Sequence, residues 1–213
     1  MNSDERTTPR SPGRLLPNSR WRYFLLAIEA ATRRSGLLFV LRQARMQRYA
    51  SLLPEDNREP EATASEYAAL VRAIERYYGR GARTTLISIG RATFEQQLQH
   101  RALRRTVAQS LLGLRPEAER QALALRWLAG EMAFPNGRVL VERAEGRLAL
   151  LDYESDGAFG RQTNAPMCWL TVGAIQAALN WATGREYGVN EIECKAMGAV
   201  ACRFEVGEAY GAP

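Results

Sequence analysis

The chain has 213 residues, of which 46% are hydrophobic, and a formal net charge of +6. This length indicates one domain, or one domain with an arm, and the hydrophobic share is enough to bury a core. No run of 18 apolar residues is present, so the sequence predicts no transmembrane helix.

Three parts are expected along the chain. Residues 1–18 are rich in Pro, Ser, Thr and Arg, and we predict a disordered arm there. Residues 19–135 are expected to form the helical part of a domain, and residues 136–210 its α/β part, which contains all three cysteines. Helices first and antiparallel strands later are typical of the α+β class.

The first two helices are predicted from apolar spacing and from their ends. Residues 21–34 place apolar side chains on one helix face, and Ser19 is a suitable cap. Gly36 is expected to break this helix. A second helix is predicted over residues 37–53, before Pro54.

The next segments are also expected to be mainly helical. A third helix is predicted over residues 65–78, with Gly79 as its C-terminal cap. The segment at 82–94 (ARTTLISIGRATF) is ambiguous, because its Thr, Leu and Ile favour a strand, whereas the family resemblance given below favours a helix. Residues 93–112 and 116–133 are predicted to be helical.

Strands are expected in the last third of the chain. Residues 134–154 predict a hairpin that turns around Gly146, because apolar side chains alternate on both sides of it. A helix is predicted from residue 166 to residue 183. Two short strands around Gly198 are expected within residues 190–206.

The three cysteines of the chain are close together in sequence. Cys168, Cys194 and Cys202 lie within 35 residues, and Glu191 precedes the middle cysteine by three positions. Three thiolates and a carboxylate are the number and type of ligands that close a tetrahedral, structural zinc shell. Buried cysteines that only pack as small hydrophobes are one alternative, and a disulfide with one cysteine left over is another. Glu193 is a rival carboxylate.

A series of motifs surrounds these cysteines. They are LLDYESDGAFG, then P-x-C at 166–168, a helix with an internal Gly, E-x-x-C at 191–194 and G-x-x-x-C-x-F at 198–204. With these motifs the chain resembles the 4-vinyl reductase domain family. GLLFVLRQARMQRYASLLP and ERYYGRGARTTLISIGRATFEQQL extend the resemblance over most of the chain, and the former is similar to the bacteriochlorophyll-pathway branch.

The resemblance implies both a fold and a metal site. The fold would be a ligand-binding one, with N-terminal helices packed on an antiparallel sheet, like nitric-oxide-signalling domains and subunits of vesicle-tethering (TRAPP) complexes. In sensor relatives zinc is held by Cys, Glu, Cys and Cys with gaps of 23, 3 and 8 residues. The same gaps here place Cys168, Glu191, Cys194 and Cys202 in those roles.

The resemblance also implies a function at the vinyl-reduction step of bacteriochlorophyll biosynthesis, on a divinyl chlorophyllide-type magnesium tetrapyrrole. A reductase needs a hydride or electron donor, yet no motif for a nicotinamide, flavin, haem or iron–sulfur cofactor is visible, and no catalytic residue can be named. We therefore expect a substrate carrier or accessory subunit. A sensor of small aromatic ligands is the alternative, and a trafficking-type scaffold is a third interpretation.

Five aromatic residues near the zinc segment are candidates for an apolar pocket suited to a flat ligand, although each alone fits an ordinary core role. They are Trp127, Phe134, Tyr153, Phe159 and Trp169. The only histidine, His100, lies in a basic stretch and is expected on the surface.

Partners and location are predicted from charge and composition. The arginines are spread along the chain without a DNA- or RNA-binding motif, so we expect no nucleic-acid binding and at most peripheral membrane contact. Family relatives suggest a homodimer, and other enzymes of the pathway are expected partners. Free thiols and the lack of a secretory segment predict the cytoplasm.

Overall fold

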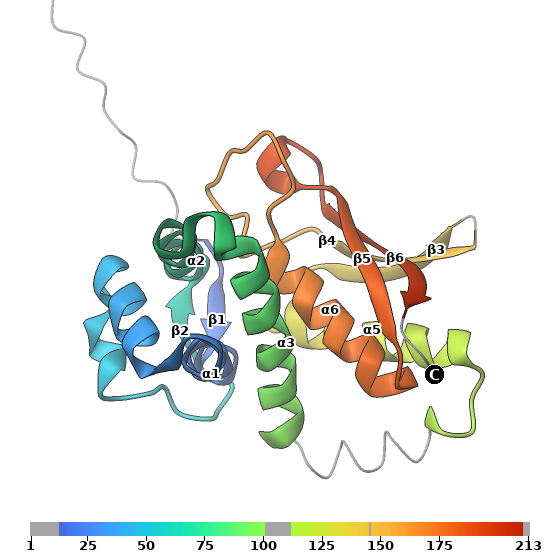
Figure 1. Cartoon of the computed structure of the whole chain (residues 1–213), viewed down its shortest axis with the longest axis horizontal. Helices are drawn as coiled ribbons and strands as arrows, with labels where there is room; N and C mark the ends of the chain where they lie inside the picture. The colour runs from blue at the N-terminus through green and yellow to red at the C-terminus, as the bar shows by residue number, and fades with distance from the viewer. Residues whose placement is uncertain (1–12, 101–111, 145, 211–213) are drawn as a thin grey trace, which may run out of the picture.

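The computed structural model describes residues 13–100, 112–144 and 146–210. An N-terminal lobe of helices packs beside a C-terminal unit in which helices pack against a four-stranded sheet (Figure 1). This arrangement confirms the predicted α+β class. Within the described ranges, every helix is too short or too polar to cross a bilayer.

The N-terminal lobe is made of six elements. They are β1 (Leu15–Pro17), α1 (Asn18–Gln43), η1 (Gln47–Ala50), β2 (Pro60–Thr63), α2 (Ala64–Tyr78) and η2 (Gly79–Gly81). β1 pairs antiparallel with β2, and Leu16 is fully buried. The prediction of an arm up to residue 18 was therefore wrong for residues 15–18, because one buried apolar side chain anchors them. Residues 1–12 lie outside the described residues.

The predicted break between the first two helices is present, but it lies at Arg33 rather than at Gly36. The φ of 63° and ψ of 170° at Arg33 are not helical, so α1 consists of two helical segments joined at this kink. A Cβ on Gly36 would lie 2.6 Å from the side chain of Thr32 and 3.1 Å from the hydroxyl of Tyr78, so the space beside this glycine is already filled by α1 and α2 side chains. The predicted helix at 37–53 is also too long, because residues 47–50 form a separate 3-10 turn.

The C-terminal cap predicted for α2 is confirmed, whereas the N-terminal cap predicted for α1 is wrong. Thr63 Oγ1 accepts a hydrogen bond from the Glu66 backbone N–H at 3.1 Å, and Glu66 Oε2 accepts one from the Thr63 N–H at 2.9 Å. This reciprocal pair is a capping box. α2 ends at Gly79 with a φ of 51°, as predicted. α1 begins at Asn18 without a side-chain cap, so Ser19 does not cap it.

The ambiguous segment is the helix α3 (Ala82–His100), and it separates two hydrophobic cores. Leu86 and Ile89 pack into the core of the N-terminal lobe, whereas Phe94 and Leu98 pack into the core of the C-terminal unit. Apolar side chains therefore lie on more than one face, which explains why no single helical stripe was visible in the sequence. Residues 101–111 of the next predicted helix lie outside the described residues.

The C-terminal unit contains the sheet. Its elements are α5 (Glu117–Ala133), β3 (Val139–Ala144), β4 (Arg147–Asp152), α6 (Trp169–Thr183), β5 (Glu186–Glu193), η3 (Lys195–Met197) and β6 (Cys202–Tyr210). The strand order is β3-β4-β6-β5, and all neighbours are antiparallel. The hairpin around Gly146 is confirmed. α6 begins three residues later than predicted, and β5 begins earlier, at Glu186.

Two glycines let α3 and α6 cross at very close range. A Cβ on Gly90 would lie 2.0 Å from the carbonyl oxygen of Leu170, and a Cβ on Gly173 would lie 2.1 Å from that of Ile87. Any larger residue would push the helices apart. This crossing is the main junction between the two parts of the molecule, and it fixes the start of α6.

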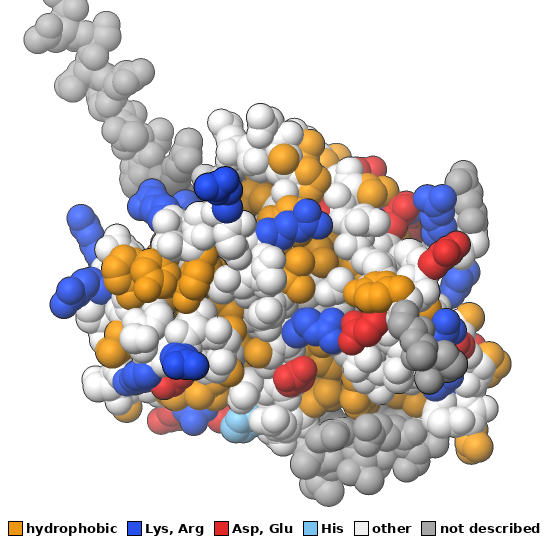
Figure 2. All heavy atoms as spheres, viewed as in Figure 1, with side chains coloured by type: hydrophobic (Ala, Val, Ile, Leu, Met, Phe, Trp, Pro, Cys, Tyr) orange, Lys and Arg blue, Asp and Glu red, His pale blue; other side chains and the backbone are white. Residues whose placement is uncertain are grey.

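Large apolar side chains are exposed on both parts of the molecule. Figure 2 shows hydrophobic side chains gathered over the N-terminal lobe, with Lys or Arg side chains around them. Leu38, Phe39 and Tyr77 belong to this exposed apolar surface, with 41%, 38% and 46% of their area accessible.

Candidate metal centre and adjoining cavity

The structure brings the four predicted metal ligands together. The ligand atoms of Cys168, Glu191, Cys194 and Cys202 lie within 4.8 Å of one another, and all four residues are buried. The Sγ–Sγ distances are 3.6, 4.0 and 4.0 Å. A disulfide needs about 2.0 Å, whereas a tetrahedral metal with bonds of about 2.3 Å to sulfur separates the sulfurs by about 3.8 Å. The observed Sγ–Sγ distances therefore fit a tetrahedral metal shell and are too long for a disulfide.

The four ligands come from three segments that the fold holds side by side. Cys168 directly precedes α6, Glu191 lies in β5, and Cys202 opens β6. Cys194 follows β5 and starts a tight turn, in which Gly198 has the left-handed φ of 95°. The backbone N–H of Lys195 donates to Cys202 Sγ at 3.3 Å, so this turn already joins two of the thiols.

A β-bulge decides which carboxylate faces the cluster. In the pairing of β5 with β6, Glu191 opposes Phe204 and Glu193 opposes Arg203, so Ile192 is an extra residue. In a regular strand, residues 191 and 193 would face the same side. The bulge instead leaves Ile192 and Glu193 exposed and returns Cys194 to the interior. Glu191, and not its rival Glu193, therefore belongs to the cluster.

The carboxylate of Glu191 has one satisfied and one unsatisfied oxygen. Its Oε2 accepts hydrogen bonds from the backbone N–H groups of Met167 and Cys168, each at 2.8 Å. Its Oε1 is buried and has no hydrogen-bond partner. Such orphaned buried acceptors are rare and call for an explanation. A cation bound to Oε1 and the three sulfurs would supply the missing partner.

The pKa shifts within the cluster also favour a bound cation. Hydrogen bonds donated by the thiols of Cys168 and Cys202 lower the pKa of Cys194. The pKa of Cys168 is raised, mainly because its thiol donates a hydrogen bond to the sulfur of Cys194. Burial raises the pKa of Glu191 to about 7. Without a cation the cluster thus tolerates little negative charge, and a divalent metal would hold all three sulfurs as thiolates.

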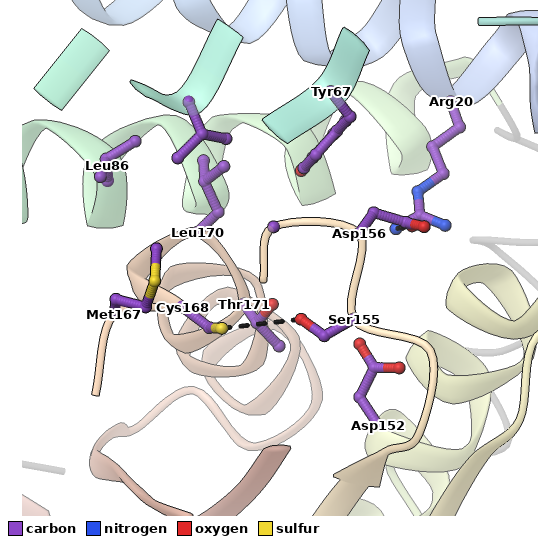
Figure 3. A pocket seen from close by; sticks show the side chains of 12 residues that line it. Arg20, Tyr67, Leu86, Asp152, Ser155, Asp156, Met167, Cys168, Leu170 and Thr171 are labelled. Atoms are coloured by element: carbon purple, nitrogen blue, oxygen red, sulfur yellow. Dashed lines mark hydrogen bonds and ion pairs between the residues drawn. The ribbon is translucent and has the colours of Figure 1, made fainter. Parts of the chain in front are cut away.

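A small polar cavity adjoins the cluster (Figure 3). Its volume is about 20 Å³, which is room for about one water molecule. It lies between α1, α2 and α3 on one side and the segment leading into α6 on the other. Ser155 Oγ and Cys168 Sγ, both at this cavity, are in hydrogen-bond contact at 3.6 Å. Its polar lining consists of Arg20, Tyr67, Asp152, Ser155, Asp156 and Thr171.

Charge in the cavity is balanced unevenly. Asp156 forms ion pairs with Arg14 and Arg20 at 2.7 Å each, so two cations balance the negative charge of its carboxylate. Asp152 has no such cation and accepts one hydrogen bond from the Glu154 N–H at 3.0 Å. Burial, and then repulsion from Asp156, raise the pKa of Asp152 to about 6. Burial likewise raises the pKa of Tyr67. The lining thus offers a carboxyl group and a phenol that hold their protons more tightly than in water.

The five predicted pocket aromatics do not line this cavity. Trp127 packs against Phe94 and Trp181 in the C-terminal core. Arginine guanidinium groups cover the rings of three others, with Arg58 over Phe134, Arg138 over Tyr153 and Arg83 over Trp169. The ring of Phe159 lies beside Gly13. Their role as a common pocket stays a prediction.

The cavity residues were missed because they come from distant segments. Tyr67 and Arg20 lie on α2 and α1, and nothing in their local sequence singles them out. Asp152 ends β4 and Asp156 lies in the loop after it, where acidic residues are usually exposed, so nothing in the local sequence pointed to their burial. His100 is exposed, with Nδ1 3.2 Å from the carboxylate of Asp56, as a surface residue should be.

Comparison with known proteins shows which family the C-terminal part of the chain resembles. Residues 158–208 match the family model of the 4-vinyl reductase domain, and this segment contains all four residues of the cluster. The match confirms the resemblance to the 4-vinyl reductase domain family in this part of the chain. No curated protein matches the sequence.

Solved structures of H-NOX proteins share the fold. An H-NOX protein from S. oneidensis in the Fe(II)NO ligation state is similar with a TM-score of 0.56 and 10% identity, over 89% of this chain and 99% of that one. An Fe(II) unliganded H-NOX protein from K. algicida reaches 0.58 and 12%, over 92% and 98%. Such low identities show the fold alone. The chain therefore combines an H-NOX-like fold with a C-terminal segment that matches the 4-vinyl reductase domain family.

Proposed function

We propose that this protein is a small-ligand-binding domain whose C-terminal unit is held together by a structural zinc ion. The observation that supports this most strongly is that cavity and cluster share Cys168. The backbone from Met167 to Thr171 carries a metal ligand, two N–H groups that bind the Glu191 carboxylate, and part of the cavity wall. A metal that fixes this segment also fixes the shape of the cavity.

Zinc fits the donor set better than other common metals. Three soft sulfur ligands and one carboxylate, at tetrahedral spacing and in a buried site, are typical of structural zinc. Glu191 Oε1 would be the fourth ligand. Its Oε2 is oriented by the N–H groups of Met167 and Cys168, which is how outer hydrogen bonds usually fix a metal-binding carboxylate.

Elemental analysis of two matched variants tests the zinc assignment. Purified protein should contain one zinc per chain. Glu191→Gln should lose zinc to a chelator at least about tenfold faster than the wild type, as expected for a weakened ligand. Glu193→Gln is the control, because this neighbouring carboxylate is exposed. Equal zinc retention in both variants would remove Glu191 from the ligand set.

The cavity favours a small hydroxyl-bearing aromatic molecule as the ligand. Pockets for drug-sized molecules enclose about 300–1,000 Å³, far more than the cavity of about 20 Å³ seen here. A small aromatic ring would displace fewer of the surrounding side chains than a macrocycle would. The carboxyl group of Asp152, the hydroxyls of Tyr67 and Ser155, and the guanidinium of Arg20 offer both donors and acceptors to a phenolic hydroxyl. A sensor role for such a ligand follows.

A magnesium tetrapyrrole is the second candidate, supported by the match to the 4-vinyl reductase domain and by the resemblance to the bacteriochlorophyll-pathway branch. In this case the protein would carry a divinyl chlorophyllide-type pigment to a partner reductase of the same pathway. The N-terminal lobe and the C-terminal unit would have to separate to admit it. The ion pairs from Arg14 and Arg20 to Asp156 connect the N-terminal lobe to the loop after β4, and these contacts would have to open.

Two titrations of the zinc-loaded protein distinguish these ligands. Phenols should raise the melting temperature, and Tyr67→Phe should weaken binding about tenfold through the loss of one hydrogen bond, while Tyr78→Phe, outside the cavity, should not. Divinyl protochlorophyllide, with and without NADPH, is followed by absorption. A red-shifted complex would support the carrier, and conversion by the protein alone would identify a reductase. No response to either ligand class would refute both proposals.

A further inference from the structure

An exposed apolar surface on the N-terminal lobe is independent of the cavity and the metal centre. It consists of Leu38 and Phe39 on α1 and Tyr77 at the end of α2, and we call these three residues the Phe39 patch. The rings of Phe39 and Tyr77 lie 4.2 Å apart, and Tyr77 contacts Tyr78 edge-on at 4.8 Å. None of these three residues lines a cavity described above. Phe39 and Tyr77 thus form an exposed aromatic pair across α1 and α2, and Leu38 is the residue before Phe39.

Arginines surround the patch without matching acids. Arg42 follows Phe39 by three positions and Leu38 by four, so it shares their helix face. Arg76 directly precedes Tyr77, and Arg80 follows it by three positions. These three arginines and Arg45 are exposed, and none of them takes part in an ion pair found among the described residues.

Two stretches of sequence next to the patch lack acidic residues. Residues 30–54 contain five arginines and no Asp or Glu, and residues 76–94 contain four arginines and no Asp or Glu. Burial, and then repulsion from Arg161 and Arg76, lower the pKa of the neighbouring Arg72. Figure 2 shows the result as hydrophobic side chains with Lys or Arg at their border. The nearest acid before Tyr77 is Glu75, and it is paired with Arg161 rather than with an arginine at the rim of the patch.

We infer that the Phe39 patch docks the protein on an anionic lipid membrane. Aromatic rings, tyrosine above all, are favoured at the depth of lipid headgroups, where one side of the ring is apolar and the hydroxyl stays wet. Arginines at the rim meet anionic headgroups, and each basic residue near such a surface contributes to binding. The patch is small, so attachment is peripheral and depends on both parts.

Charge complementarity distinguishes a lipid surface from a second copy of this chain. A patch that packed against its own copy would bring the same uncompensated arginines together across the contact, and like charges destabilise such an interface. An anionic bilayer supplies many negative headgroups and needs no groove to receive three projecting side chains.

Vesicle sedimentation with the full chain tests the docking surface. The protein is mixed with vesicles of phosphatidylcholine alone, and with vesicles in which about a third of the lipid is phosphatidylglycerol, which gives the surface a potential of the kind that attracts basic segments. Sedimentation is expected only with the anionic vesicles, and it should decrease as salt is raised.

Two sets of variants separate the patch from the net charge of the protein. Phe39→Ser with Tyr77→Ser should lower partitioning at least about tenfold, because the apolar anchor is removed. Arg42→Ala and Arg76→Ala should each lower it about fivefold. Leu140→Ser and Arg147→Ala, exposed on the β3–β4 hairpin, are the matched controls and should bind like the wild type apart from a small charge effect.

Each other outcome would overturn the docking surface. The first is a wild-type protein that stays in solution with anionic vesicles. The second is a Phe39→Ser, Tyr77→Ser protein that sediments like the wild type. The third is a loss of dimer mass in light scattering, without a change in sedimentation, which would assign the patch to a contact between copies. Circular dichroism and zinc content confirm that the variants are folded.

Discussion

The two cores of this molecule are stabilised in different ways. The N-terminal core is filled by large side chains such as Trp21 and Phe24, which are fully buried and contact each other. The C-terminal core contains the cysteine cluster, which joins the ends of β5 and β6 to the start of α6. We infer that hydrophobic packing alone stabilises the first, whereas the second depends on an added metal. The following changes test this contrast.

The largest effect is expected when the metal shell is opened. Cys194→Ser should release zinc and cost more than about 4 kcal/mol of stability, because metal-binding energy is folding energy. Hydrogen exchange should show the loss of protection in β5, β6 and α6, while α1 and α2 keep theirs. Val200→Ser, at an exposed position of the same turn, is the control. Equal losses in both lobes would show that the two cores unfold as one unit.

The helix crossing should be the next most sensitive feature, because it joins the two cores. Gly173→Ala places a Cβ against the carbonyl of Ile87 and should destabilise the protein by about 1–3 kcal/mol in a denaturant titration. Gly130→Ala on α5 meets no atom within 4 Å and should be neutral or stabilising by up to about 1 kcal/mol. If the two alanines behaved alike, the close approach of α3 and α6 would be wrong.

Asp152 should make the junction sensitive to pH. Its pKa is raised from 3.8 to about 6, so ionisation disfavours the folded state, and stability should fall as pH rises from about 4 to 6. Asp152→Asn should remove this fall and stabilise the protein at pH 7 by at most about 3 kcal/mol. Thermal melts at pH 4 and pH 7 measure the difference between variant and wild type. Exposed Glu154→Gln should leave it unchanged.

The smallest effect is expected at the cap of α2, within the lobe that needs no metal. Thr63→Ala removes one half of the capping box and should cost about 1 kcal/mol. Thr84→Ala, exposed in α3, should cost nothing or stabilise slightly, because alanine is the better helix former. Chelation should not change the effect of Thr63→Ala. A dependence on zinc would mean that the N-terminal lobe also relies on the metal.

Local signals predicted the parts of the structure that local physics determines. The glycine stop of α2 and the hairpin at Gly146 were predicted from a few neighbouring residues, and the capping box of α2 is equally local although it was not predicted. α3 was ambiguous because it is buried on two sides, so its pattern reflects two cores rather than one. The kink at Arg33 and the cavity beside Tyr67 depend on tertiary packing, which a single sequence does not display. The four residues of the cysteine cluster were predicted from the family resemblance, whose gaps of 23, 3 and 8 residues this chain repeats, and the structure brings them together.

That spacing has a meaning beyond this site. Side chains of a regular strand alternate, so two residues separated by an odd number of positions point to opposite faces. Glu191 and Cys194 are three apart, yet both face inward, because Ile192 is the extra residue of a bulge. The two-residue gap in the E-x-x-C motif therefore depends on the β-bulge as well as on the residues that face the cluster. A regular, unbulged strand over the same residues would turn Glu191 and Cys194 to opposite faces and destroy the site, without changing any ligand.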